Sequence, residues 1–262
     1  MITSTQNPRI KHLLELEQKS QLRRKEGVFV LEGHREVEHC LEAGFCVRTA
    51  FVCEAVGGAD VRLPQDTEVV DVSQHVYERI AYRGGTEGIV AVVEARQLTL
   101  SDLHLSDAPL IVVLESVEKP GNLGAVLRSA DAAGADAVVV CDPLTDLYNP
   151  NLIRSAIGAV FTVPCVACTS QECIAFLREK GIQVLTAQLQ DSAPYYDTPM
   201  TGPTAIVMGT EATGLTEQWR QAADRHIRIP MLGRLDSLNV SVSAAILLFE
   251  AVRQRQTPIH YI

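Results

Sequence analysis

Three polar segments of the chain carry side chains that could do chemistry, and each follows a run of apolar residues. In the first, Asn122, Gly124 and Arg128 come after the apolar run 110–114. Gly124 and Arg128 are four residues apart, so on a helix they share one face. The missing side chain of Gly124 clears space for the guanidinium of Arg128 to lie toward the preceding loop, where it could stabilise negative charge. Asn122 is a candidate cap for this helix; the alternative is an ordinary helix with a surface arginine.

The second segment, residues 209–216, nearly matches a phosphate-binding P-loop. Gly209 and Gly214 have the required spacing, but Leu215 occupies the position of the lysine that contacts the phosphates. The segment therefore does not predict hydrolysis of a nucleoside triphosphate. Two glycines around Glu211 instead predict a loop whose backbone can approach a ligand closely. The pattern Gly-x-Gly-x-x-Gly does not occur in the sequence, which removes the dinucleotide-binding signature.

The third segment, residues 229–243, predicts a loop that leads into a helix. It begins with Ile229 and Met231 on either side of a proline, and its polar end offers Ser237 or Asn239 as the helix cap. In open α/β sheets, ligands bind beyond the carboxyl ends of the strands. All three segments occupy such positions, so together they form the candidate site.

The elements that must position these segments are predicted by apolar runs that alternate with helical patterns. This alternation is typical of an α/β fold with a mostly parallel sheet. The run 110–114 is apolar throughout, as in a strand buried on both faces. We expect strands at residues 28–31, 47–53, 89–93, 110–114, 137–140, 183–186, 205–208 and 227–229. We expect one helix to begin at Pro8 after an Asn7 cap, and others at residues 34–43, 73–80, 122–133, 151–161, 171–180 and 239–254.

The pattern predicts two domains joined by a linker. Residues 97–109 lack clear periodicity and end in Ser-Asp-Ala-Pro, which is typical of a connecting segment. We therefore expect a small α/β domain at 1–96, a linker at 97–109 and a larger α/β domain at 110–262.

The composition is that of an ordinary globular protein, with 262 residues, 47% apolar and 21% charged. No stretch has the roughly 18 consecutive apolar residues of a membrane span, and the start of the chain lacks the blocks of a signal peptide. The odd number of cysteines, seven, predicts a reduced, cytoplasmic protein rather than a disulfide framework. Cys165 and Cys168 have metal-ligand spacing, but no second such pair follows, so we expect small buried cysteines and no metal.

Charge is distributed unevenly. The net charge of −9 argues against binding to nucleic acid by bulk charge alone. Residues 1–28, however, hold six basic and three acidic residues. A basic arm on an acidic body is compatible with RNA binding, and a solvated helix face is the alternative. The candidate RNA-binding residues are Arg9, Lys11, Arg23, Arg24 and Lys25.

In combination and spacing, the three segments resemble the ordered motifs of the SpoU (TrmH) branch of the SPOUT methyltransferases. The resemblance spans about residues 110–255. Residues 1–96, with Asn7-Pro8 and the sequence Val-Leu-Glu-Gly at 30–33, more weakly resemble the ribosomal-protein-like RNA-binding domain often joined to this catalytic domain. The family methylates ribose 2′-hydroxyls of ribosomal or transfer RNA with S-adenosylmethionine. The resemblance also implies a trefoil knot near the C-terminus and a homodimer, and the very apolar helix predicted at 239–254 favours a dimer too.

The resemblance assigns roles by motif position. It implies that the catalytic set is Arg128, Asn122, Glu211, Ser237 and Asn239, and that the cofactor pocket includes Thr186, Gly209, Ile229, Met231 and Leu238. Arg128 is the family's catalytic arginine. A guanidinium with a pKa above about 12 is a poor base, so we favour a role in holding the adjoining phosphate and stabilising the developing alkoxide. Two positions depart from the family pattern: Thr210 stands where Asn is usual, and Ala212 where Gly is usual.

Other functions are open from the sequence. Ribosomal RNA is favoured over transfer RNA as the substrate. A catalytically silent RNA-binding or ribosome-assembly factor would keep the fold without turnover, although Arg128 and Asn239 argue against it. A small-molecule methyltransferase would leave the basic arm without a purpose.

Overall fold

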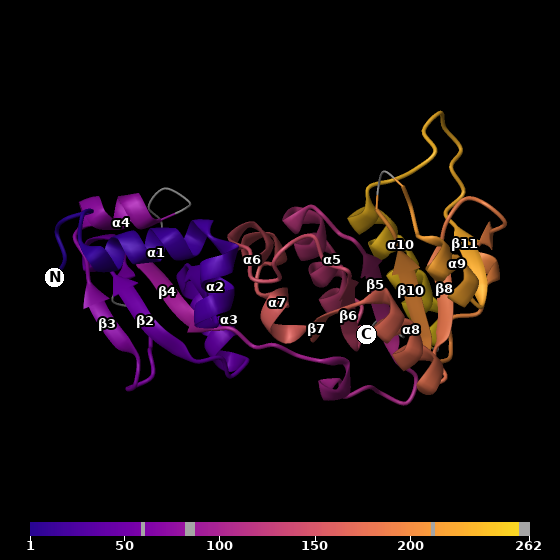
Figure 1. Ribbon diagram of the computed structural model, residues 1–262, viewed down its shortest axis with the longest axis horizontal. Coiled ribbons are helices and arrows are strands. Elements are labelled where there is room, and N and C mark those ends of the chain that lie inside the picture. Colours follow the sequence, from indigo (N-terminus) through magenta and orange to yellow (C-terminus); the bar gives the residue numbers. More distant parts are fainter. Residues whose placement is uncertain (59–60, 82–86, 211–212, 257–262) are drawn as a thin grey trace, which may run out of the picture. The chain divides into compact units, whose positions relative to one another are not determined.

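The computed structural model describes residues 1–58, 61–81, 87–210 and 213–256. These residues form two compact units, each with its own sheet (Figure 1). The first unit combines residues 1–96 with residues 148–161, and the second contains the other described residues. Within the described parts of the chain, none of the helices has both the length and the apolar character needed to cross a bilayer.

The first unit is a four-stranded sheet with the order β1-β4-β2-β3. Its central strand, β4, pairs antiparallel with β1 and β2, whereas β2 and β3 are parallel. The strands are β1 (Val28–Glu32), β2 (Val47–Val52), β3 (Glu68–Asp71) and β4 (Ile89–Glu94). Among the described residues of 1–96, the helices are α1 (Pro8–Gln18), α2 (Ser20–Glu26), α3 (His34–Glu42) and α4 (Gln74–Ile80), with a short 3-10 turn η1 (Glu54–Val56).

The capping residue, the first-turn proline and the apolar periodicity of residues 7–18 explain why helix α1 forms. The Oδ1 atom of Asn7 accepts a hydrogen bond from the backbone N–H of Arg9 at 2.9 Å, and Pro8 opens the first turn. Ile10, Leu13 and Leu16 lie on one face and are buried in the core with β1 and α4. The prediction of a helix beginning at Pro8 is confirmed. Helix α2 and strand β3 were not predicted.

Residues 148–161 complete the first unit with α6 (Pro150–Ala156) and the start of α7 (Ala159–Thr162). The predicted single helix 151–161 is wrong, because Ile157 and Gly158 have positive φ angles of 49° and 89°. Such angles end an α-helix. A side chain at Gly158 would also meet the ring of His39, since a Cβ there would lie 2.3 Å from Nδ1.

Aromatic rings hold this segment in the first unit. The ring of Phe29 stacks on that of Tyr148 with centroids 4.5 Å apart, and Phe45 meets Phe161 edge-on at 5.3 Å. The hydroxyl of Tyr148 donates to the carbonyl of Arg96 at 2.8 Å. The guanidinium of Arg96 in turn lies 4.1 Å above the ring of Phe45.

The second unit is a seven-stranded sheet with the order β7-β6-β5-β10-β8-β11-β9, and every neighbouring pair is parallel. Its strands are β5 (Leu110–Glu115), β6 (Ala137–Cys141), β7 (Cys165–Cys168), β8 (Gln183–Ala187), β9 (Ala193–Pro194), β10 (Thr204–Met208) and β11 (Arg225–Arg228). The neighbouring strands β6, β5 and β10 are buried along their whole length. The predicted α/β class with a mostly parallel sheet is confirmed; β7 and β9 were not predicted.

Helices cover both faces of this sheet (Figure 1). On one face α8 (Ser170–Glu179) and α9 (Glu217–Ala222) enclose a core that includes Trp219 and alternate residues of β5, β6 and β10. On the other face α5 (Pro120–Ala132) packs against α10 (Val240–Arg255), and α10 contacts β10. The edge helix α9 was not predicted.

The segment that precedes β5 is tied to this unit. It contains the 3-10 turn η3 (Leu100–Asp102), and Leu100, Leu103 and Leu105 pack on the core beneath α8. Near the end of α10, Arg255 donates to the carbonyls of Ala108 and Met200 at 2.7 and 2.8 Å. A second 3-10 turn, η4 (Tyr195–Asp197), follows β9. The predicted trefoil knot stays a prediction.

Candidate active site

The carboxyl edge of the large sheet gathers segments that are far apart in the sequence. Strands β5, β10, β8 and β11 are consecutive neighbours and all parallel, so their carboxyl ends share one edge. Thr186 lies near the end of β8, Gly209 directly follows β10, and Ile229 directly follows β11. This is the edge at which open α/β sheets bind ligands.

A hydrogen bond joins the first and third polar segments. The Nδ2 atom of Asn239 donates to Oδ1 of Asn122 at 3.1 Å, although the two residues are 117 positions apart. Asn239 also caps α10, because its Oδ1 accepts from the backbone N–H of Ser241 at 3.0 Å and from its hydroxyl at 2.6 Å. The predicted capping role of Asn122 is wrong. Helix α5 begins two residues earlier, at Pro120, so Asn122 lies in the first turn and its side chain meets Asn239 instead.

Arg128 is exposed near the middle of α5. It forms no hydrogen bond or ion pair with any residue that the structure describes. Gly124, one turn earlier, is buried. The guanidinium is thus available to an anionic ligand, which suits a residue that binds phosphate.

The loop after β10 is a tight turn whose backbone requires glycine. A Cβ at Gly209 would lie 2.2 Å from the carbonyl carbon of Gly214, and Gly214 itself has a φ of 69°. The amide of Gly214 donates to the carbonyl of Thr210 at 3.1 Å, and the amide of Thr213 donates to the Thr210 hydroxyl at 3.0 Å. The Thr210 side chain therefore helps to shape the turn. Glu211 and Ala212 lie outside the described residues.

Glu115 anchors the far end of this loop and was missed by sequence reasoning. It ends β5, is only 2% exposed, and accepts from the backbone N–H and the hydroxyl of Thr216 at 2.8 and 2.6 Å. The hydroxyl oxygen of Ser170 lies 3.4 Å from this carboxylate and accepts from Trp219 Nε1 at 2.9 Å, while its proton is donated to Asp142 at 2.6 Å. A buried carboxylate needs such partners. The sequence did contain a signal for this role, because Glu115 is an acidic residue directly after the apolar run 110–114.

The end of β8 presents a buried acceptor that a ligand could satisfy. The hydroxyl of Thr186 lies 2.6 Å from Nδ1 of His226, so it already has a partner. Gln188 follows β8, and its buried Oε1 has no hydrogen-bond partner within the described part of the chain. Leaving such a group unpaired is unfavourable. The edge therefore fits a ligand that donates an N–H group.

The loop between β11 and α10 extends away from the sheet (Figure 1). Ile229 and Met231 are partly buried at its start. Ser237 and Leu238 are exposed near its end, and the hydroxyl of Ser237 donates to Oδ1 of Asp236 at 3.2 Å. The structure thus brings Ile229 to the carboxyl edge, whereas Ser237 makes only this local contact among the described residues.

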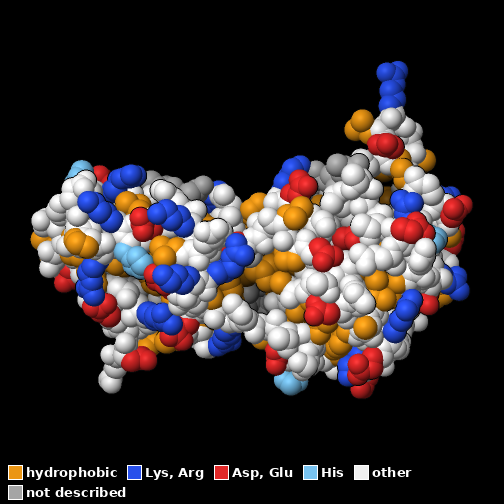
Figure 2. Space-filling model, in the orientation of Figure 1, with side chains coloured by type: hydrophobic (Ala, Val, Ile, Leu, Met, Phe, Trp, Pro, Cys, Tyr) orange, Lys and Arg blue, Asp and Glu red, His pale blue; other side chains and the backbone are white. Residues whose placement is uncertain are grey.

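The predicted RNA-binding residues on α1 and α2 differ in exposure. Lys11, Arg24 and Lys25 are exposed, and Figure 2 shows Lys and Arg side chains gathered on one face of the first unit. Arg9 forms an ion pair with Glu68. Arg23 is only 3% exposed, and its guanidinium donates to the carbonyls of Leu16 and Glu17 at 2.6 and 2.9 Å. Arg23 therefore holds the end of α1 rather than facing solvent.

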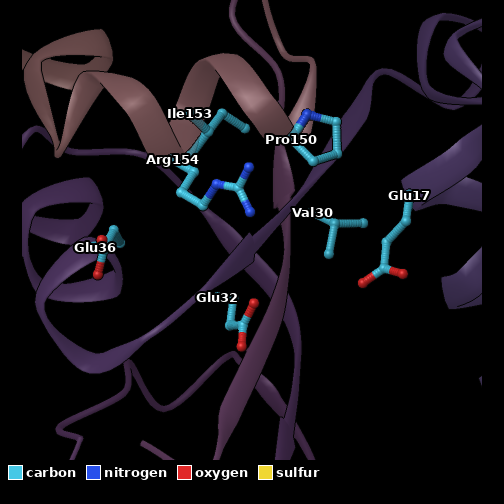
Figure 3. Close-up of a pocket in the computed structure, with 7 residues that line it drawn as sticks. All are labelled: Glu17, Val30, Glu32, Glu36, Pro150, Ile153 and Arg154. Carbon is cyan, nitrogen blue, oxygen red and sulfur yellow. The ribbon is translucent and has the colours of Figure 1, made fainter. Parts of the chain in front are cut away.

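A pocket in the first unit is chemically unlike a phosphate site. Glu17, Glu32 and Glu36 line it together with Arg154 of α6 (Figure 3). Burial and the neighbouring Glu32 raise the pKa of Glu17 to about 7, while Arg79 acts in the opposite direction. Three carboxyl groups around one guanidinium disfavour a phosphate.

Comparison with known proteins gives consistent matches over both units. The SpoU rRNA Methylase family matches residues 109–249, and the MRM3-like substrate binding domain matches residues 7–91. The chain is 31% identical over 248 residues to the 23S rRNA (guanosine(2553)-2'-O)-methyltransferase RlmP of Bacillus subtilis (strain 168), covering 95% of this chain and 97% of that protein. It is 41% identical over 176 residues to the 23S rRNA (guanosine-2'-O-)-methyltransferase RlmB of Photobacterium profundum, covering 65% of this chain and 72% of that protein.

A solved structure extends the similarity to the full chain. The AdoMet-bound rRNA methyltransferase from Sinorhizobium meliloti has a TM-score of 0.89 and 30% identity, and the match covers 98% of each chain.

Proposed function

This chain belongs to the SpoU rRNA methylase family, and from that premise we propose that it transfers a methyl group from S-adenosylmethionine to a ribose 2′-hydroxyl of ribosomal RNA. The observation that carries the proposal is the assembly of three distant segments at one carboxyl edge, where Asn122 and Asn239 are directly hydrogen-bonded. Relatives named as 23S rRNA 2'-O-methyltransferases support ribosomal rather than transfer RNA as the substrate.

The cofactor pocket is proposed at the ends of β8, β10 and β11. S-adenosylmethionine, when bound, supplies an activated methyl group. The unpaired Oε1 of Gln188 is an acceptor suited to an amino group of the cofactor. The backbone of Gly214 and Leu215 packs where a side chain of Gly209 would lie, so Gly209 can offer a ligand only its backbone groups. The proposed pocket residues are Thr186, Gly209, Ile229, Met231 and Leu238, with Gln188 added.

Arg128 is proposed to stabilise charge during transfer. Methyl transfer to the 2′-oxygen would leave S-adenosylhomocysteine, and the proton of the 2′-hydroxyl would pass to solvent, so negative charge develops on this oxygen during the attack. A planar guanidinium can bind the adjoining phosphate and stabilise this alkoxide, whereas its pKa above about 12 makes it a poor base. The Asn122–Asn239 contact fixes the start of α5 against the start of α10. By motif position, Glu211 and Ser237 complete the proposed catalytic set.

The first unit is proposed to bind the RNA substrate. Lys11, Arg24 and Lys25 are exposed on two consecutive helices, and exposed cations are what phosphate binding requires. The family matches at 7–91 and 109–249 support a division into an RNA-binding domain at 1–96, a linker at 97–109 and a catalytic domain at 110–262. To this division the structure adds that residues 148–161 pack with the first unit and residues 97–109 with the second.

We also propose a cytoplasmic homodimer formed through the catalytic domain. On α10, Val242 and Phe249 are 47% and 48% exposed, although both are large and apolar. All seven cysteines are free thiols, in keeping with a reducing compartment.

The decisive test combines ribose-methylation mapping with a reconstituted reaction. Ribosomal RNA from cells with and without the gene would be compared nucleotide by nucleotide, and the purified protein would then be added to the unmethylated RNA with labelled cofactor. We expect one ribosomal site to lose and then regain its 2′-O-methyl group. Methylation confined to transfer RNA would refute the substrate, and cofactor binding without turnover on either RNA would favour the assembly factor.

A further inference from the structure

Three cysteine thiols from different elements lie together in the second unit. The sulfur atoms of Cys141, Cys168 and Cys173 all lie within 4.8 Å of one another. Cys141 ends β6 and Cys168 ends β7, and the two residues face each other in the parallel register. Cys173 lies near the start of α8. Cys165 has metal-ligand spacing to Cys168 in the sequence, but it is not part of this cluster. The third thiol comes instead from Cys141 on the neighbouring strand.

The scaffold around the thiols is well fixed. Thr169 and Glu172 form a capping box at the start of α8, with both side chains bonded to the opposite backbone amides. The hydroxyl of Ser170 donates to Asp142 at 2.6 Å, which ties the same helix start to the residue after Cys141. The three sulfur atoms are therefore placed by packed elements rather than by a loose loop, as a preorganised ligand set requires.

The geometry is close to that of a metal site. Tetrahedral zinc with Zn–S bonds of about 2.3 Å places its sulfur ligands about 3.8 Å apart. Small inward movements of side chains would close the distances seen here. Thiolates are soft ligands that favour Zn²⁺ and Cu⁺ over the harder cations.

Acidic residues flank the thiol cluster. Glu172 directly precedes Cys173 in α8, and Asp142 directly follows Cys141 and accepts a hydrogen bond from Ser170. Negatively charged neighbours favour a bound cation.

The cluster also has a route to solvent. Cys141 and Cys173 are fully buried, but Cys168 is partly exposed and lines an open pocket with Thr99 and Glu172. A metal site needs such an entry path.

We propose that Cys141, Cys168 and Cys173 bind one thiophilic metal ion, Zn²⁺ or Cu⁺, through three thiolates. The protons of the three thiols pass to solvent when the ion binds. The site is separate from the proposed methyl-transfer residues and does not depend on that function.

Competition titration of the full-length protein tests the proposal. Zn²⁺ and Cu⁺ would each be titrated against a chromophoric chelator, with Co²⁺ as a spectroscopic substitute for Zn²⁺. We expect one equivalent to bind tightly and Co²⁺ to show thiolate charge-transfer absorption. Cys168→Ser should weaken binding by more than about 100-fold, because even outer-shell changes cost about 10- to 100-fold. Cys165→Ser, on the same strand, is the matched control and should bind as the original protein does.

Thiol protection gives a second measurement that needs no variant. Alkylation followed by mass spectrometry should modify Cys168 in the metal-free protein and spare it after metal addition, while exposed Cys46 reacts in both cases. Binding of only one of the two ions would identify that ion as the ligand. Equal binding by the Cys165→Ser and Cys168→Ser proteins, or no protection of Cys168 by either ion, would overturn the proposal.

Discussion

Arg128 offers the sharpest test of how the proposed site stabilises charge. If its guanidinium acts as the methyl group transfers, Arg128→Ala should lower the single-turnover rate by about 10²- to 10³-fold, the range lost with one oxyanion-type donor. Cofactor affinity should stay nearly unchanged. Arg128→Lys should recover little, because an ammonium group cannot reproduce the planar pair of donors. The measurement is methylation of the cognate RNA at saturating cofactor, with cofactor affinity from calorimetry.

Two results would contradict this role for Arg128. A change in turnover of less than about twofold for both variants would make Arg128 an ordinary surface residue. A loss of cofactor affinity with an intact rate at saturation would place it in the cofactor pocket instead.

Glu17 predicts a pH dependence for the stability of the first unit. Its pKa is raised to about 7 by burial and by Glu32, from an ordinary value of 4.5. The folded state therefore holds a proton that the unfolded state has lost between these values, so stability falls as the pH rises from about 4.5 to 7. Glu17→Gln removes this loss. In denaturant unfolding, the free energy of unfolding of the variant, relative to that of the original protein, should therefore increase between pH 5 and pH 8.

Glu15 on the same helix provides the control. It is exposed, and its hydrogen bond and ion pair with Lys19 lower its pKa. Its contribution to stability is present above its unfolded pKa and is lost only as the pH falls through its lowered value, so Glu15→Gln should not change the slope between pH 5 and pH 8. Parallel stability curves for Glu17→Gln and the original protein would refute the assignment.

At the scale of elements, the basic residues of α1 and α2 have two roles, which are RNA binding and stabilisation of the first unit. Lys11, Arg24 and Lys25 are exposed, so replacing all three with Gln should weaken RNA binding. The slope of log K against log salt concentration should flatten by about 2 to 3 units if each contacts one phosphate.

Arg23→Ala should instead destabilise the first unit by about 1.5–3 kcal/mol, because buried carbonyls lose a charged donor. Filter binding at several salt concentrations and denaturant unfolding measure the two effects.

These assignments would be reversed by two observations. An unchanged salt slope in the triple variant would make the exposed cations a solvated helix face. If the Arg23→Ala protein were as stable as the original and its RNA affinity depended less steeply on salt, Arg23 would be an RNA-binding residue.

Elements with strong periodicity or clear caps could be predicted from the sequence. Helix α1 is marked by Asn7 and Pro8, and β5 by an unbroken apolar run. Strand β7 has only four residues and no alternating pattern, so nothing local indicates it. The break between α6 and α7 places Ile157 in a left-handed conformation that β-branched residues rarely adopt. No pattern in the sequence signals such an exception.

The candidate site was predictable as a set of segments but not as a set of contacts. Motif spacing indicated which loops matter, because each follows an apolar strand. The bond between Asn122 and Asn239 and the bonds between Glu115 and Thr216 join residues more than 100 positions apart. Such pairings depend on strand order, which local periodicity does not contain. The same is true of Cys141, which meets Cys168 only because β6 and β7 are neighbours.

For the whole molecule, the exposed apolar residues of the second unit predict self-association. Phe249 on α10 is 48% exposed, and Leu232 and Leu235 in the loop before α10 are 99% and 75% exposed. Light scattering at micromolar concentration should give twice the mass of one chain. Phe249→Glu should shift the protein toward monomer, because it places a charge in an apolar interface. Val69→Glu, at an exposed position of the first unit, is the control, and a monomeric original protein would refute the dimer.

The grouping of residues 148–161 with the first unit affects how the molecule can be divided. Phe29 and Phe45 pack against Tyr148 and Phe161. A fragment that stops at residue 96 would expose these rings to water and lose their apolar burial. We therefore expect dissection at residue 96 to destabilise the N-terminal unit.

The hydrogen bond between Asn122 and Asn239 cannot form until the ribosome has synthesised both residues. At about 5–20 residues per second, a ribosome needs roughly 6 to 23 s to add the residues between them. During that interval β5 waits for its neighbour β10, which is also made late. The proposed site therefore does not exist on a nascent chain until α10 has emerged, and a chain released before Asn239 would carry the RNA-binding helices without the means to methylate what they hold.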